Sequence, residues 1–170
     1  MPNATVLGLD PGTRRFGWGV VSQQGTRLLH RAHGVIRLDE HQVLAMRLVQ
    51  LERELAEILR LHVPTEASAE SLFFAKDPQA ASKLGHARGV ALLVCARASL
   101  SIAEYPPALV KRAVVGSGRA EKDQVARMVR VLLGLADEPV FDAADALAVA
   151  LTHLQHAPKR LAFAHASLSR

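Results

Sequence analysis

The order of apolar and polar residues predicts strands first and helices afterwards. Residues 4–9 form a short apolar run that ends at the turn sequence Asp10-Pro11-Gly12, as is typical of a buried strand followed by a tight turn. Residues 16–21 and 26–37 predict two more strands, joined by a glycine-containing turn. Because these three strands follow one another closely, we expect an antiparallel meander.

The hydrophobic period changes after residue 40. Leucine and isoleucine recur every three or four residues, which predicts an amphipathic helix over 40–62 that ends at Pro64. The remaining predicted elements are a short strand at 65–70, a helix at 77–99 with Asp77 as N-cap and Pro78 in its first turn, a strand at 100–105, and helices at 106–114, 121–133 and 142–154. This order predicts an α/β fold with a mixed sheet, part antiparallel and part parallel, and helices packed on it.

Composition favours one globular domain. The chain has 170 residues, of which 49% are hydrophobic and 22% charged, and this excludes disordered and fibrous classes. We expect residues 1–155 to form the domain. Residues 156–170 contain Lys159, Arg160 and Arg170 but no acid, and we expect them to be a basic, flexible tail.

The chain shows no signal for export or membrane insertion. No apolar run approaches the length of about 18 residues that a membrane span requires. The N-terminus lacks the basic start and long apolar stretch of a signal peptide. The single Cys95 cannot form an internal disulfide and is expected to pack as a small hydrophobe. We therefore expect a cytoplasmic protein that does not bind membranes.

The positive charge is concentrated in the middle of the chain. The formal net charge is +5, and residues 76–127 hold nine basic against four acidic residues, which accounts for the whole excess. Such a segment predicts a face that binds a polyanion, with a solvated basic surface as the alternative.

Three aspartates are candidates for chemistry. Asp10 ends the first predicted strand, where a carboxylate can hold a cation or orient a substrate. Asp142 and Asp145 are three residues apart and share one helix face, an arrangement that a nearby cation makes favourable. Each has a structural alternative: Asp10 as a turn residue, Asp142 as an N-cap and Asp145 as a partner of the helix dipole.

Two loops are candidates for nucleic-acid contact. Glu70 runs directly into Leu72-Phe73-Phe74, and loop aromatics beside basic residues can stack on bases, although they also close the edges of cores. A glycine-containing loop at 116–118, flanked by basic residues, can follow a phosphate backbone or be simply solvated. The eight histidines and one cysteine show no zinc-type spacing, and no Gly-x-Ser-x-Gly nucleophile motif occurs.

Five of these segments, in one order, resemble the RuvC family of bacterial crossover junction (Holliday junction) endodeoxyribonucleases. They are residues 8–19 (GLDPGTRRFGWG), 70–76 (ESLFFAK), 83–91 (KLGHARGVA), 111–122 (KRAVVGSGRAEK) and 142–148 (DAADALA). The resemblance runs from about residue 5 to residue 154. The sequence departs from the family pattern at Thr13, where Ser is common, and at Trp18, where Tyr is common.

The resemblance implies a ribonuclease-H-like fold with a mixed five-stranded sheet, and a metal-dependent nuclease. It implies that Asp10, Glu70, Asp142 and Asp145 converge as catalytic residues and ligands of two Mg²⁺ ions, with Mn²⁺ as a possible substitute. The products would carry 5′-phosphates. The DNA contacts expected from the matching motifs and the basic segment are Phe73, Phe74, Lys76, Lys83, Arg88, Lys111, Arg119 and Lys122.

The resemblance also implies partners. The substrate would be a four-way DNA junction, resolved by symmetric nicks in two opposed strands during homologous recombination and DNA repair. A junction with approximate two-fold symmetry suits a homodimer, and the apolar helix over 77–99 is a candidate interface. The branch-migration proteins RuvA and RuvB are further partners that the family implies.

Two other functions are compatible with parts of the sequence. Asp10-Pro11-Gly12-Thr13 after a strand also resembles the first phosphate loop of actin-like ATPases and sugar kinases, but those proteins need a second glycine-rich loop and a longer chain. The other alternative is a DNA-binding module that has lost its nuclease site. The presence of all four acids argues against it.

Overall fold

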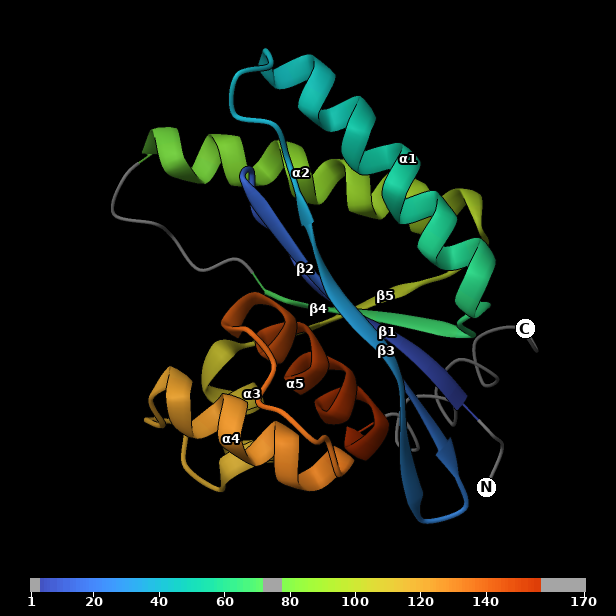
Figure 1. Ribbon diagram of the computed structural model, residues 1–170, viewed down its shortest axis with the longest axis vertical. Coiled ribbons are helices and arrows are strands. Elements are labelled where there is room, and N and C mark those ends of the chain that lie inside the picture. The colour runs from blue at the N-terminus through green and yellow to red at the C-terminus, as the bar shows by residue number, and fades with distance from the viewer. Residues whose placement is uncertain (1–3, 72–77, 157–170) are drawn as a thin grey trace, which may run out of the picture.

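The computed structural model describes residues 4–71 and 78–156, which build a mixed five-stranded sheet in the order β3-β2-β1-β4-β5 (Figure 1). The first three strands are an antiparallel meander, and β4 and β5 run parallel to β1. The strands are β1 (Ala4–Asp10), β2 (Arg15–Gln24), β3 (Arg27–Arg37), β4 (Glu66–Glu70) and β5 (Ile102–Tyr105). The predicted α/β class and ribonuclease-H-like sheet are thus confirmed.

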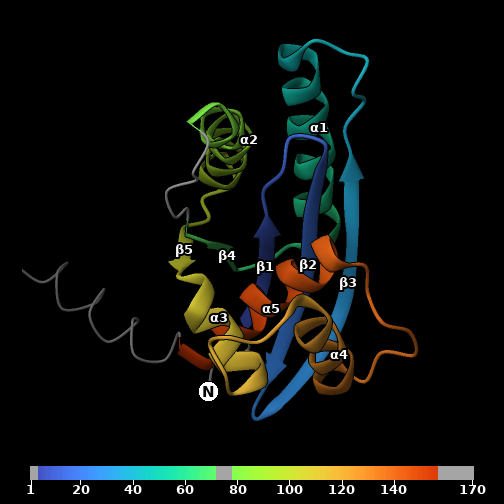
Figure 2. The same ribbon diagram turned by 90° about the vertical axis from the view of Figure 1, so that its left-hand side faces the viewer.

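Helices cover both faces of the sheet. Figure 1 shows α1 and α2 on one side and α3, α4 and α5 on the other, and Figure 2 shows the same groups after a 90° turn. Along β1, Leu7 and Leu9 join the core on the α1–α2 side, whereas Val6 joins the core beneath α5. Because both faces are buried, the strand is a continuous apolar run. The helices are α1 (Leu44–His62), α2 (Pro78–Arg97), α3 (Pro107–Val115), α4 (Lys122–Leu133) and α5 (Phe141–His156).

The structure corrects one predicted boundary and explains one strand of low β propensity. Helix α1 begins at Leu44 rather than at residue 40, because the Asp39 carboxylate accepts a hydrogen bond from the His41 backbone N–H and forms a local turn instead. Strand β4 has little intrinsic β propensity but forms because it pairs with β1 on one side and β5 on the other. The predicted N-cap Asp77 and the predicted tail at 157–170 lie outside the described residues.

Helix α5 lies against the middle of the sheet, and glycines allow its close approach. A Cβ atom at Gly8 would lie 1.9 Å from the Ala146 carbonyl oxygen, and one at Gly17 would lie 2.0 Å from the Asp142 carbonyl oxygen. At its other end, His153 is buried, with Nδ1 2.8 Å from the Tyr105 hydroxyl. The helix that carries two of the candidate acids is therefore fixed along its length.

Cys95 and the membrane prediction can be followed in the structure. Cys95 is a residue of α2 whose side chain is buried in the core, and burial raises the pKa of its thiol to about 11, so it packs as an uncharged, unreactive group. Among the residues that the structure describes, no helix has both the length and the apolar character needed to cross a bilayer.

Candidate active site

The fold brings the candidate acids together at one end of the sheet. Asp10 is the last residue of β1 and Glu70 the last of β4, and these strands are parallel neighbours with Leu9 opposite Ala69. The first turns of α5 add Asp142 and Asp145 beside them. Residues from three distant parts of the sequence therefore meet, as the resemblance implied.

A small hollow of about 130 Å³ forms between these elements. Helix α3 contributes Lys111 and helix α4 contributes Lys122, so cationic side chains from two helices face carboxylates from two strands and a third helix. The lining residues are Asp10, Glu70, Asp145, Lys111 and Lys122, with Pro107, Val110 and Val125 as the apolar wall.

The carboxylates disturb one another's ionisation. Burial, and then the nearby charges of Asp145, Glu70 and Asp142, raise the pKa of Asp10 from 3.8 to about 8. Burial is also the main reason that the pKa values of Glu70 and Asp145 are raised. The ionised forms of these acids are thus poorly stabilised by their surroundings, and a bound cation would favour them.

Two basic side chains partly compensate the acids. Lys122 Nζ donates a hydrogen bond to Asp145 Oδ2 at 3.2 Å, and its pKa is raised chiefly by the charge of Asp145. Arg15 Nε lies 2.7 Å from Asp142 Oδ2. Arg15 was missed from the sequence, although the meander was a usable signal: β2 returns beside the end of β1, with Gly17 opposite Asp10.

The chemistry of the donors fits hard divalent cations. All four candidate ligands are carboxylates, which suit Mg²⁺ or Mn²⁺ better than Zn²⁺. As the side chains stand, no group of three or more His, Cys, Asp or Glu residues within 4–71 and 78–156 is arranged to hold an ion. Arg15 and Lys122 each contact one oxygen of Asp142 and Asp145, respectively, so these side chains would compete with an ion for the two carboxylates.

The three aspartates could instead have structural roles, as an N-cap, a partner of the helix dipole or a turn residue. These roles explain fewer of the observations than a shared site does. Helix α5 begins at Phe141, so Asp142 lies in its first turn rather than at the N-cap. Asp145 lines the hollow and contacts Lys122. A turn role for Asp10 does not account for the large rise in its pKa, which comes from burial and three neighbouring acids.

The predicted DNA contacts have different surroundings. Lys83 on α2 and Arg119 before α4 are exposed. Arg88 is buried: it donates a hydrogen bond from Nη1 to the Glu70 carbonyl oxygen at 3.1 Å and forms an ion pair with Glu104. Arg88 therefore holds the end of β4 that carries Glu70. Phe73, Phe74 and Lys76 lie outside the described residues.

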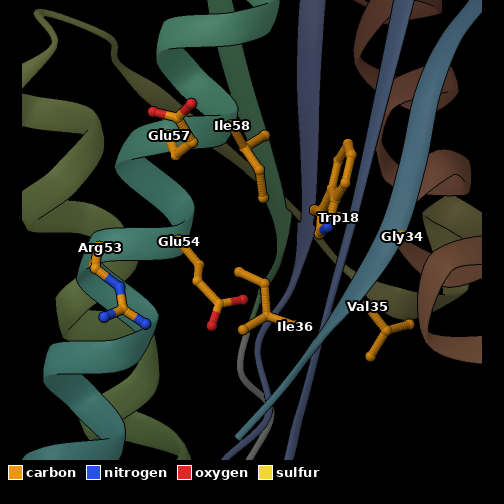
Figure 3. A pocket seen from close by; sticks show the side chains of 8 residues that line it. All are labelled: Trp18, Gly34, Val35, Ile36, Arg53, Glu54, Glu57 and Ile58. Carbon is orange, nitrogen blue, oxygen red and sulfur yellow. The ribbon is translucent and has the colours of Figure 1, made fainter.

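A second hollow lies on the opposite side of the sheet and is larger, at about 640 Å³. Figure 3 shows Trp18 and Ile36 from the sheet facing Glu54 and Ile58 from α1. The Trp18 ring lies against Gly34, where an added Cβ would be 3.0 Å from the ring. None of the predicted catalytic residues lines this hollow.

Comparison with known proteins gives a consistent result. The family model described as "Crossover junction endodeoxyribonuclease RuvC" matches residues 6–153. A crossover junction endodeoxyribonuclease RuvC from Sorangium cellulosum is 58% identical over 152 residues, which cover 89% of this chain and 85% of the relative, and the RuvC of Azorhizobium caulinodans is 54% identical over 151 residues, which cover 89% of each chain.

Solved structures show the same similarity. T. thermophilus RuvC in complex with Holliday junction substrate has a TM-score of 0.87 at 33% identity, covering 92% of this chain and 96% of that one. The yeast mitochondrial Holliday junction resolvase Ydc2 has a TM-score of 0.62 at 16% identity over 86% of this chain and 76% of that one, a likeness of fold.

Proposed function

The chain belongs to the RuvC family of crossover junction endodeoxyribonucleases, and we propose that Asp10, Glu70, Asp142 and Asp145 are its catalytic, metal-binding residues. The observation that carries this proposal is the carboxylate cluster at the ends of β1, β4 and α5, in which the pKa of Asp10 is raised to about 8 by burial and by the other three acids. Perturbed acids in a hollow are typical of catalytic sites.

The reaction is hydrolysis of a DNA phosphodiester, and nucleases of this family depend on divalent metal ions. We propose two Mg²⁺ ions, replaceable by Mn²⁺, with the four carboxylates as ligands. When bound, such ions stabilise the charge on the attacking and leaving oxygens. Water adds to phosphorus, the bond to the 3′ oxygen breaks, and the products carry a 5′-phosphate and a 3′-hydroxyl.

The surrounding residues of this chain position the strand that is cut. Lys122 is exposed over about two thirds of its side chain, at 67%, so its ammonium can leave Asp145 for a phosphate. Lys111 reaches the same hollow from α3. Arg88 holds the backbone of Glu70 and so acts through that residue. Further phosphate or base contacts are proposed for Phe73, Phe74, Lys76, Lys83 and Arg119.

The substrate that we propose is the four-way junction, cut by symmetric nicks in two opposed strands. Two-fold symmetry of the junction favours a homodimer. Exposed Leu92 and Leu93 on α2, at 40% and 48% exposure, support this helix as the interface.

We further propose RuvA and RuvB as partners and the cytoplasm as the location. Residues 1–155 would form the nuclease domain, followed by a basic tail at 156–170.

Cleavage of a synthetic junction tests the function directly. The protein is incubated with a four-way junction or a linear duplex of the same sequence, in MgCl₂ or in EDTA, and the products are resolved on a denaturing gel. We expect paired nicks at symmetric positions in two opposed junction strands, 5′-phosphate ends, and no cleavage in EDTA. Equal cleavage of the linear duplex, or cleavage that persists in EDTA, would contradict the proposal.

A further inference from the structure

Phe141 is an exposed aromatic residue at the start of α5, directly before Asp142. Its exposed fraction is 50%, and that of the preceding Val140 is 53%. The described parts of the chain contain four aromatic side chains, and the other three, Phe16, Trp18 and Tyr105, are buried or partly buried in the cores. A single exposed apolar residue is ordinary on a protein surface, so the position of Phe141 is what requires an explanation.

The helix geometry places Phe141 at the rim of the site. It is the first residue of α5, directly before Asp142 and four residues before Asp145. Residues four apart lie on the same side of a helix, so Phe141 stands one turn outside Asp145, which lines the hollow. Arg15 contacts Asp142 and Lys122 contacts Asp145, so each of the two aspartates has a cation as neighbour as well as Phe141 nearby on the same helix.

The start of α5 packs closely against the sheet. The Ala144 backbone N–H donates to the Val140 carbonyl oxygen at 2.8 Å. The close contact of Gly17 with the Asp142 carbonyl leaves no room for the helix to move closer to β2. Phe141 is therefore presented at a fixed place relative to the carboxylates.

We propose that Phe141 is a DNA-contacting residue that packs its ring against the sugar or base beside the phosphate that is cut. The inference rests on the proposed function, because it takes the four carboxylates as the cleavage site. A phenyl ring offers no hydrogen bond, and a nucleotide next to a bound phosphate presents apolar faces of base and deoxyribose. A protein partner covering Phe141 would also lie over the hollow beside it, which DNA needs to enter.

Junction binding in the absence of cleavage tests this contact. The cut positions are mapped first with the wild-type protein, and 2-aminopurine is then placed beside the cut phosphate. In the Asp10→Asn background, we expect Phe141→Ala to weaken binding about 5- to 20-fold and to remove the fluorescence change of 2-aminopurine. The salt dependence should stay the same, because a phenyl ring releases no counter-ions. Phe141→Trp should restore both affinity and fluorescence change.

The control is Leu61→Ala, which removes a side chain of similar exposure, 58%, from the last turn of α1 on the other side of the sheet. It should leave binding and fluorescence unchanged. Should Phe141→Ala be poorly folded by circular dichroism, Phe141→Leu keeps an apolar side chain without the ring and should still lose the fluorescence change. Wild-type affinity and fluorescence in the folded variant would overturn the inference alone. Normal cleavage by Asp10→Asn would instead overturn the assignment of the site.

Discussion

The two hollows on opposite sides of the sheet both combine acidic and basic side chains, but they differ in how the charges are stabilised. Glu57 at the larger hollow is exposed and accepts two hydrogen bonds, at 2.8 and 2.6 Å, from Arg60, which does not itself line the hollow, and this lowers the pKa of the carboxyl group. In the smaller hollow, burial and neighbouring acids raise the pKa of Asp10 to about 8. The proposed site is therefore the smaller hollow, and it is marked by poorly stabilised charge rather than by volume.

The physical reason for the difference is access to water. Glu57 and Arg60 face solvent, which screens their charges, so their ion pair has little consequence for stability or function. Asp10 ends a strand that lies between two others and is only partly exposed, so less water reaches it than reaches Glu57. A divalent cation would stabilise carboxylate charges most where water stabilises them least. This favours the smaller hollow as the place for metal and DNA.

The largest expected difference between the two hollows is in cleavage. Asp10→Asn should reduce junction cleavage about 1,000-fold or more, because it removes a carboxylate that we assign to the ion site. Junction binding, measured by fluorescence anisotropy, should be retained. The matched control is Glu57→Gln in the larger hollow, which should cleave like the wild type. Comparable losses in both variants would contradict the contrast.

The free energy of unfolding should depend on pH through Asp10 in the smaller hollow. The pKa of Asp10 is about 8 in the folded protein against 3.8 for a free side chain, so between these values the folded state holds a proton that the unfolded chain has released. The free energy of unfolding should therefore fall as pH rises from about 4 to about 8. In EDTA, Asp10→Asn should be at least about 2 kcal/mol more stable than the wild type at pH 8, with the difference vanishing towards pH 4.

Chemical denaturation across this pH range, at constant ionic strength, measures the effect. Glu57→Gln serves again as the control and should follow the pH dependence of the wild type. A difference between Asp10→Asn and the wild type that stays constant from pH 4 to pH 8 would show that Asp10 ionises normally.

The lysines of the smaller hollow should contribute to DNA affinity. Lys111→Ala and Lys122→Ala should each weaken junction binding about 3- to 10-fold and reduce the slope of log affinity against log salt concentration by about one. Arg53→Ala, at the larger hollow, removes one positive charge from the other side of the sheet and should change neither quantity. An unchanged salt slope in both lysine variants would exclude phosphate contacts by these residues.

The smallest expected effect concerns Arg15. Its guanidinium competes with a metal ion for Asp142, so Arg15→Gln should tighten Mn²⁺ binding about 2- to 5-fold in the absence of DNA. Isothermal titration calorimetry measures this directly. The neighbouring Arg14 pairs with Glu40 at 3.3 Å, and Arg14→Gln should leave Mn²⁺ affinity unchanged. Equal affinities for both variants and the wild type would argue against Asp142 as a ligand.

The elements of the fold could be predicted from local patterns, but their convergence could not. The change of hydrophobic period after residue 40 marks the transition from strands to helices, and Pro64 lies just beyond the end of α1. Asp10 and Glu70 are sixty residues apart, and only the parallel pairing of β1 with β4 makes them neighbours. The hydrophobic periodicity along the chain does not indicate which strands pair. The four acids could therefore be grouped only through family resemblance.

Two arginines show the same limit at the level of single residues. Arg88 lies in a motif and a basic segment that predicted a DNA contact, yet it is buried and holds the Glu70 carbonyl oxygen. Arg15 was not singled out, yet it contacts Asp142. The charge of a side chain is visible in the sequence, whereas its burial and its partner depend on the packing of other elements.

The close contact at Gly17 has a consequence for how the enzyme can change over time. Any larger residue there would push the start of α5 outwards and carry Asp142 away from the strand that bears Asp10. Mutational drift at this position would thus alter the spacing of the acids without touching any of them. A survey for inactive natural variants should look at Gly17 as closely as at the acids themselves.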